Sequence, residues 1–169
     1  GLFVEVKAEY AKEMVTGFIQ LDGVTVGAVA NRTAIYDENG EKAEEFAAVL
    51  TTDGAYKAAE FVTFCNAFEI PVLSLTNVKG FEANVRAEKT IAKAAAKLVY
   101  AFSNADVPKV NVITGEAYGS AYVAMNSKSV GADMVYAWSQ ASIGMMDASL
   151  AAKIMYPGGQ AMNFSVYAK

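Results

Sequence analysis

From residue 53 onward, segments with helical spacing alternate with β-branched runs, and this alternation constrains the fold most strongly. A helical pattern over 53–68 precedes the apolar run 70–78, and an Ala- and Lys-rich helical pattern over 86–105 precedes the run 109–115. Strands separated by helices pair through crossover connections, which favours a mostly parallel sheet with helices packed outside it. We therefore expect an α/β fold.

The other segments are shorter, and one of them has a strong turn signal. Asp22-Gly23 lies between two β-prone runs, which predicts a tight hairpin over 17–32. Asp53 is the expected N-cap of the helix that follows it. The remaining pattern predicts helices over 10–18, 119–129 and 147–155, strands over 133–138 and 141–146, and a polar loop with a charged surface segment over 36–46.

The chain has no histidine and a single cysteine, Cys65. Ser-His-Asp and Cys-His catalysis within the chain are therefore excluded, as are histidine-based metal sites and a structural zinc site, so we expect no metal. Chemistry in this chain must use carboxylates, lysines, hydroxyls or backbone amides.

The charge and the cysteine count also limit partners and location. The formal net charge is −4 and no basic patch stands out, so nucleic acid is not expected as a partner. No apolar stretch reaches the ~18 residues that a membrane span requires. A lone cysteine permits no internal disulfide, and the N-terminal sequence is too charged for a signal peptide, which together favour a cytoplasmic protein.

Two turn sequences follow predicted strands, where ligands of α/β folds usually bind. They are "TNVKGF" over 76–81 and "GEAYGSAY" over 115–122. Glycine gives the first turn backbone freedom at Gly80, and small residues at the start of the predicted helix permit close approach in the second. An ordinary structural turn is the alternative for both.

Backbone amides are the groups through which these turns could act. The first amides of a helix lack an intrahelical acceptor, so those of Ser120 and Ala121 could stabilise a developing oxyanion. A second donor could come from Gly80 or Phe81. The Ser120 hydroxyl has no base beside it in the sequence, which leaves it as a small helix-start residue.

Most other conspicuous side chains fit structural roles. Three lysines spaced four apart and Glu88 form a solvated helix face, and Trp138 is expected to pack at a strand end. The lysines are Lys89, Lys93 and Lys97, and the expected core residues are Cys65, Met125, Met145 and Met146.

Longer stretches carry a family resemblance. The runs "EYAKEMVTGFIQLDGVTVGAVANR" and "AKLVYAFSNADVPKVNVITGEAYGSAYVAMNSKSVGADMVYAW" resemble the C-terminal half of biotin-dependent carboxyltransferases. That family comprises the β subunits of acyl-CoA carboxylases and the α subunits of sodium-pumping decarboxylases, including methylmalonyl-CoA decarboxylase. The resemblance runs from near the N-terminus to about residue 156.

The resemblance implies a crotonase-like (ClpP/crotonase) fold built from repeated β-β-α units. It implies that residues 1–169 form a single carboxyltransferase C-terminal domain, a fragment of a two-domain subunit. The activity implied is transfer of a carboxyl group between biotin and an acyl-CoA of the propionyl/methylmalonyl type, in either the carboxylase or the decarboxylase direction. We expect the isolated fragment to be inactive.

The resemblance also assigns site residues and partners. Biotin, carried on a separate carrier domain or protein, would be bound by the turn Gly119, Ser120 and Ala121 and by the loop Gly80 and Phe81. These backbone groups are the expected catalytic groups, because biotin itself can take the substrate proton. Expected partners are the biotin carboxyl carrier, an acyl-CoA, further copies of the subunit and, for a decarboxylase, membrane subunits.

The chain departs from the family pattern in and just after the first turn, and at one position of the second. The usual "VPGFxPG" is "VKGFEAN" here, so Lys79 replaces proline and Ala83-Asn84 replace Pro-Gly, while Ser120 replaces the second glycine of "YGGAY". Two other functions therefore stay open. One is a crotonase-like hydratase or isomerase, which would need a placed carboxylate pair that the turns do not show. The other is a non-catalytic scaffold subunit.

Overall fold

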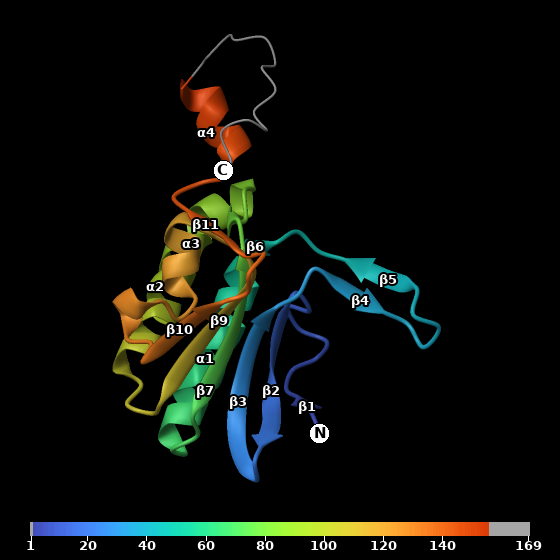
Figure 1. Cartoon of the computed structure of the whole chain (residues 1–169), viewed down its shortest axis with the longest axis vertical. Coiled ribbons are helices and arrows are strands. Elements are labelled where there is room, and N and C mark those ends of the chain that lie inside the picture. Colours follow the sequence, from blue (N-terminus) through green and yellow to red (C-terminus); the bar gives the residue numbers. More distant parts are fainter. Residues whose placement is uncertain (1, 156–169) are drawn as a thin grey trace.

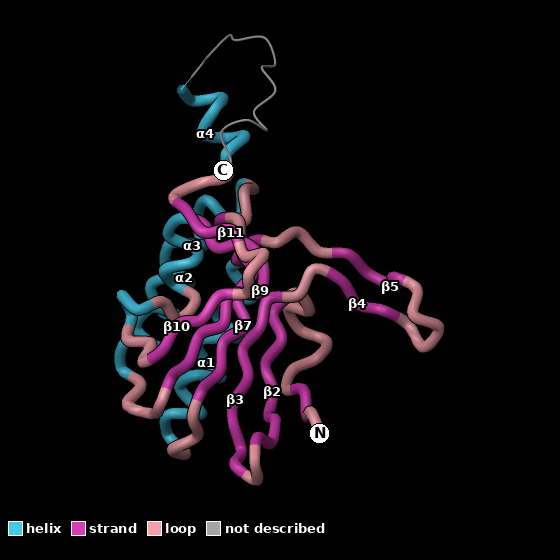
Figure 2. Tube along the Cα trace, in the orientation of Figure 1, coloured by secondary structure: helices cyan, strands magenta, loops and turns pink. Residues whose placement is uncertain are grey.

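A computed structural model of the chain describes residues 2–155. Among these residues a main sheet of seven strands packs against helices α1 (Thr52–Ala67) and α2 (Val85–Asn104) (Figures 1 and 2). The strands lie in the order β1 (Val4–Glu5), β2 (Met14–Leu21), β3 (Val24–Asn31), β7 (Val72–Val78), β9 (Lys109–Tyr118) and β10 (Met134–Ala137), and β11 (Ser142–Gly144) pairs with the far end of β9.

The sheet is mostly parallel, as the sequence predicts. β3, β7, β9 and β10 run parallel to one another, whereas β2 is antiparallel to both β1 and β3. A β-β-α order occurs in β7-β8-α2, with β8 at Gly80–Phe81, and in β10-β11-α4, with α4 at Ala148–Met155, while three short strands over 34–36, 42–45 and 49–50 separate β2-β3 from α1. No helix in the described residues is both long and apolar enough to span a membrane.

The hairpin that joins β2 and β3 forms at the predicted position. Asp22 and Gly23 have φ angles of 50° and 79°, and Leu21 pairs with Val24 across the turn. Positive φ at both central residues gives the turn the twist of its flanking strands, and Asp-Gly accepts that backbone at low cost.

The helix predicted over 10–18 is wrong. β2 begins at Met14, and the residues before it form turns, with a positive φ of 44° at Ala11 that a helix does not allow. β2 pairs with β1 on one side and with β3 on the other, so hydrogen bonding within the sheet outweighs a short local helical pattern.

Residues 36–46 form more regular structure than the predicted loop. β4 (Ala34–Tyr36) and β5 (Lys42–Glu45) pair as an antiparallel hairpin, which projects away from the sheet (Figure 1). The Asp37 carboxylate accepts the backbone N–H groups of Asn39 and Glu41, both at 2.9 Å, and so closes the turn. The charged surface character of this segment is confirmed, because most of its residues are exposed.

The predicted apolar stripe of α1 forms the centre of the core. Five of its residues are fully buried, and burial raises the pKa of the Cys65 thiol to about 12. Phe68 is the exception, since it lies beyond the last helical turn and is 63% exposed. The N-cap is Thr51, not Asp53, because the Thr51 hydroxyl oxygen accepts the Gly54 N–H. The buried residues are Ala55, Ala58, Ala59, Val62 and Cys65.

The helix predicted over 119–129 is broken into α3 (Gly119–Ala124) and the 3-10 turn η1 (Lys128–Val130). Asn126 lies between them with a φ of 58°, and its buried amide donates to the Ser74 hydroxyl at 2.9 Å. This hydrogen bond ties the break to β7 and stabilises a backbone angle that a continuous helix would not contain.

Some predicted core residues near the C-terminus are exposed. Met125 is fully buried as expected, but Met145 and Met146 are 84% and 40% exposed, and Trp138 is 64% exposed rather than packed. They lie on or after the last strands, β10 and β11, and no described element covers them.

Candidate functional site

The two predicted turns meet at the carboxyl end of the parallel strands. β7 and β9 are neighbours, and Val78 is in register with Ala117 after a bulge near Thr76. Residues 76–81 therefore lie beside residues 115–121, at the end of the sheet that carries α3 and β11 (Figure 1). α3 also contacts β8, so the helix start and the loop residues Gly80 and Phe81 share one region.

The turn between β9 and α3 requires glycine at its centre. Gly119 has a φ of 59°, and a Cβ added there would lie 3.1 Å from the Met145 carbonyl oxygen. Ser120 has no positive φ and is exposed, so replacing the family's glycine with serine leaves an ordinary helical backbone. Ala121 is buried, and no side chain caps the first amides of α3.

The turn between β7 and β8 is built differently. Gly80 has no positive φ, so the backbone freedom expected of it is not used, and a Cβ there would meet no atom within 4 Å. β8 instead pairs with β6 (Val49–Leu50), and the Lys79 N–H donates to the Ala48 carbonyl at 2.7 Å. Phe81 is partly buried and packs against the core. Neighbouring backbone therefore holds this turn in place.

Asn77 connects the two turns, and the sequence did not single it out. Its side-chain oxygen accepts the Glu116 N–H at 3.0 Å, and its own N–H donates to the Asn31 side chain at 3.2 Å. A Cβ at Gly115 would lie 2.6 Å from the same Asn77 oxygen, so glycine is needed there for close approach. Asn77 is a polar residue near the end of an apolar strand, and this pattern could have identified it from the sequence.

Charged side chains also gather at the two turns. Lys79 Nζ lies 3.3 Å from Glu116 Oε2. Hydrogen bonds from Ser149 lower the pKa of the nearby Asp147 carboxyl, and the charge of Lys79 lowers it further. The sequence shows no placed carboxylate pair in the turns, and Glu116 was not singled out from it. Across residues 2–155, no three Cys, Asp or Glu side chains gather as a metal ion would require.

An acidic hollow of about 590 Å³ lies next to this region. Part of its wall is the segment 82–84, which directly follows β8. Its carboxylates would repel phosphate, so a nucleotide's phosphate groups do not fit this hollow. The carboxylates that line the hollow belong to Glu13, Glu45, Asp53 and Glu82.

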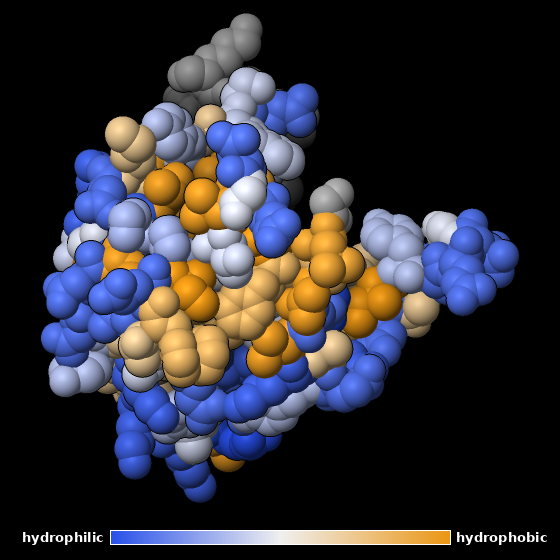
Figure 3. Space-filling model, turned by 90° about the horizontal axis from the view of Figure 1, so that it is seen from below, coloured by the Kyte–Doolittle hydropathy of each residue, from blue (hydrophilic) through white to orange (hydrophobic). Residues whose placement is uncertain are grey.

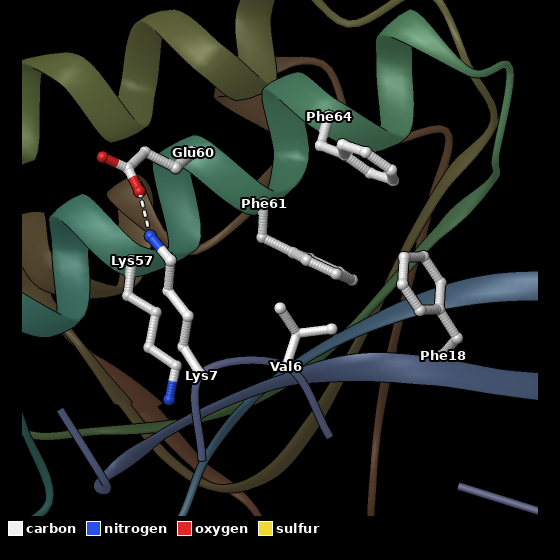
Figure 4. A pocket seen from close by; sticks show the side chains of 7 residues that line it. All are labelled: Val6, Lys7, Phe18, Lys57, Glu60, Phe61 and Phe64. Carbon is white, nitrogen blue, oxygen red and sulfur yellow. Dashed lines mark hydrogen bonds and ion pairs between the residues drawn. The ribbon is translucent and has the colours of Figure 1, made fainter. Parts of the chain in front are cut away.

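An apolar pocket of about 350 Å³ lies at the other end of the sheet, between β2 and α1 (Figure 4). The rings of Phe18 and Phe61 pack in its wall with their centroids 5.1 Å apart and their planes tilted by 50°, and Lys7 pairs with Glu60 at its edge. Seen from this end, the molecule shows a band of hydrophobic side chains bordered by hydrophilic ones (Figure 3). Phe18 is level with the start of β7, so the pocket is remote from the two turns.

Lys57 is the one buried cation at this pocket among the described residues, and it is only 1% exposed. Its ammonium donates to the carbonyl oxygens of Tyr10 and Ala11, at 2.7 and 3.3 Å, and burial lowers its pKa. These bonds fix the turn that precedes β2. Lys57 therefore has a structural role.

The chain has extensive similarity to known proteins. Residues 1–163 match the carboxyl transferase domain family. The chain is 45% identical over 159 residues to the propionyl-CoA carboxylase beta chain of Roseobacter denitrificans, which covers 94% of this chain and 29% of that one. It is 41% identical to the methylmalonyl-CoA carboxyltransferase 12S subunit of Propionibacterium freudenreichii subsp. shermanii, over 92% of this chain and 28% of that subunit.

Solved structures of carboxyltransferase subunits are similar to this chain in fold as well as in sequence. The crystal structure of the transcarboxylase 12S hexamer with methylmalonyl-CoA bound superposes with a TM-score of 0.82 at 41% identity, over 94% of this chain and 29% of that chain. The geranyl-CoA carboxylase beta subunit of P. aeruginosa gives 0.77 at 26% identity, over 91% and 27%.

These matches confirm the crotonase-like fold that the sequence resemblance implies. The chain spans less than a third of the length of the curated relatives that it matches, a smaller share than the expected half of a subunit. Since the match extends from residue 1 to residue 163 and includes both turns, the chain belongs to the carboxyl transferase domain family.

Proposed function

We propose that this chain is the biotin-binding part of a biotin-dependent acyl-CoA carboxyltransferase. The observation that carries the proposal is the meeting of the two turns, with Val78 in register with Ala117. In this arrangement the start of α3, with the amides of Ser120 and Ala121, lies beside the segment that carries Gly80 and Phe81. Two sets of backbone donors beside one another are suited to a carbonyl oxygen that gains negative charge.

The donor groups fit biotin, whose ureido carbonyl is uncharged and accepts hydrogen bonds. No side chain caps the start of α3, so its first amides are available to a ligand. No atom lies within 4 Å of a Cβ placed on Gly80, which leaves room beside the other donor pair. Bound biotin would supply a carrier for the carboxyl group, and the chain would hold its carbonyl oxygen and stabilise the charge there.

The substrate we propose is an acyl-CoA of the propionyl or methylmalonyl type. The support is the names of the relatives, which include a propionyl-CoA carboxylase and a methylmalonyl-CoA carboxyltransferase. The acidic hollow beside β8 is unsuited to the phosphates of CoA. We therefore propose that the CoA moiety binds elsewhere in the full-length protein, and that a biotin carboxyl carrier delivers biotin to the two turns.

We also propose that the full-length protein self-associates. The face of the sheet opposite α1 and α2 carries apolar side chains that no described helix covers, and two of them, Met134 and Tyr136, are 54% and 55% exposed. Their parallel partners Val110 and Val112 extend the same face. Contiguous exposed apolar surface of this kind is typical of an interface.

A hydratase or isomerase activity is less well supported by the geometry. Two carboxylates lie near the turns, but Glu116 is paired with Lys79, and the lowered pKa of Asp147 is the opposite of what a general acid at neutral pH needs. Neither group is therefore poised to exchange a proton with a substrate.

The test is carboxyl transfer by the purified full-length protein. Methylmalonyl-CoA and free biotin or biocytin are supplied, and propionyl-CoA formation is measured by chromatography with and without biotin. We expect formation that depends on biotin, and none from the isolated 169-residue chain. Hydration of crotonyl-CoA without biotin would support a hydratase instead, and no turnover with either substrate would support a scaffold.

A further inference from the structure

Lys79 and Glu116 form an ion pair that joins the two turns. Lys79 belongs to the turn between β7 and β8, and Glu116 lies at the end of β9, just before the turn into α3. Lys79 Nζ and Glu116 Oε2 are 3.3 Å apart, and the two side chains are 55% and 29% exposed. The pair is therefore partly screened by water but not fully solvated.

The backbone on each side of the pair is already fixed. The Lys79 N–H donates to the Ala48 carbonyl at 2.7 Å, and the Glu116 N–H donates to the Asn77 side chain at 3.0 Å. Because both residues start from anchored backbone, the ion pair adds a side-chain contact to the backbone pairing that already holds the turns side by side. Its loss is therefore expected to loosen the contact between the turns rather than to unfold either one.

A third segment adds a second negative charge at the same place. The charge of Lys79 helps to lower the pKa of Asp147, and the nearby Met145 carbonyl packs against Gly119. Removal of the lysine would leave Glu116 without its ion-pair partner and Asp147 without one of the groups that lower its pKa.

We propose that Lys79 and Glu116 are positioning residues that hold the two donor turns at the separation needed for biotin. This inference rests on the proposed function of the turns. Lys79 stands where the family pattern has proline, so an electrostatic link replaces a rigid backbone ring in this chain. Neither side chain needs to touch biotin for this role.

The experiment compares variants of the full-length protein in the biotin-dependent assay. Lys79→Met and Glu116→Gln each remove one partner, and the double variant Lys79→Glu with Glu116→Lys restores the pair in reverse. The matched control is Lys42→Met, which removes the Lys42–Glu45 ion pair of similar geometry on the β4–β5 hairpin, with Lys42 45% exposed.

We expect each single variant to raise the KM for free biotin about two- to five-fold, the range that a partly exposed ion pair supports. The KM for methylmalonyl-CoA should not change, and Lys42→Met should behave as the natural protein. The KM for biotin of the natural protein should rise with ionic strength, whereas that of Lys79→Met should not, because screening acts on an intact pair. The reversed pair should recover at least half of the loss.

Hydrogen exchange on the same proteins tests the link without using activity. Lys79→Met should speed amide exchange in both segments, 76–84 and 115–122, while Lys42→Met should not. Unchanged biotin KM together with unchanged exchange would overturn the positioning role. A natural protein that fails to transfer carboxyl groups would overturn the proposed function, and the exchange result would then decide on the ion pair by itself.

Discussion

The two turns of the candidate site are adjacent in space but are held in opposite ways. The turn between β9 and α3 depends on its own backbone, because Gly119 has a φ of 59° and lies against the Met145 carbonyl. The turn between β7 and β8 has no such strained residue and is held by hydrogen bonds to the segment around β6. The first turn is therefore specified by residue type and the second by its neighbours.

The departures of the chain from the family pattern are spread unevenly over the two turns. The departures at Lys79, Ala83 and Asn84 all lie in or just after the externally held turn. There the Lys79 N–H donates to the Ala48 carbonyl, a hydrogen bond that the proline of the family pattern could not donate, and the Glu82 N–H donates to the Leu50 carbonyl. In the other turn, Ser120 replaces glycine only at a position of ordinary φ, and Gly119 itself is present.

The largest effect should come from Ser120→Pro, which removes one proposed donor. Ser120 is the second residue of α3, where proline has no N–H to donate, and the φ of 59° at the preceding Gly119 makes a test of folding necessary. Loss of one oxyanion donor typically lowers kcat about 100-fold or more. We expect a loss of that size in biotin-dependent carboxyl transfer by the full-length protein.

The control is Val85→Pro, which places proline at the first residue of α2, an exposed position whose own N–H is not a proposed donor. It should retain activity. Circular dichroism and thermal unfolding show whether each proline variant is folded. A folded Ser120→Pro protein with nearly full activity would contradict the backbone assignment.

Alanine at the two glycines measures the difference between the turns directly. Gly119→Ala forces a side chain into a positive φ, which costs about 1–2 kcal/mol of unfolding free energy, and its Cβ would press on the Met145 carbonyl. Gly80→Ala adds a Cβ to open space at an ordinary φ. We expect about a ten-fold loss of kcat for Gly119→Ala, which is smaller than the loss of about 100-fold expected when a whole donor is removed. For Gly80→Ala we expect a loss of kcat of less than about two-fold.

Denaturant unfolding of the same two proteins provides the stability comparison. Equal destabilisation by the two alanines would show that the turns are held alike, and the contrast between them would then be wrong.

The parallel sheet and its turns could be predicted because they depend on local patterns. The alternation of helices and strands, the Asp22-Gly23 hairpin and the positions of Gly119 and Gly80 are all visible in short windows of sequence. What those windows do not contain is pairing between distant segments. β2 replaces a predicted helix because β1 and β3 pair with it, and Asn126 breaks the helix after α3 because Ser74 holds its side chain.

The charged part of the site was missed for the same reason. Glu116 is plainly present in the second turn, but its partner Lys79 is 37 positions away along the chain, and Asp147 is 31 positions beyond Glu116. Only the register of β7 with β9 brings the first two together. Likewise Trp138 and Met145 have core-type side chains, yet their exposure follows from the absence of a covering element in the described residues.

The smallest effect should come from Ser120→Ala, which separates the backbone from the hydroxyl. Alanine keeps the N–H, the ordinary φ and the small size of the exposed Ser120, and it is the better helix former. If the turn acts through its amides, kcat and the KM for biotin should stay within about two-fold of the natural values, since one exposed hydroxyl contributes little. Steady-state kinetics of the full-length protein at several biotin concentrations provides both constants. Ser120→Ala and Ser120→Pro differ in the donor N–H, so a large ratio between their kcat values assigns the chemistry to the backbone. A folded Ser120→Ala protein with a ten-fold or greater loss of kcat would assign it to the hydroxyl instead, and the β9–α3 turn would then act through a side chain.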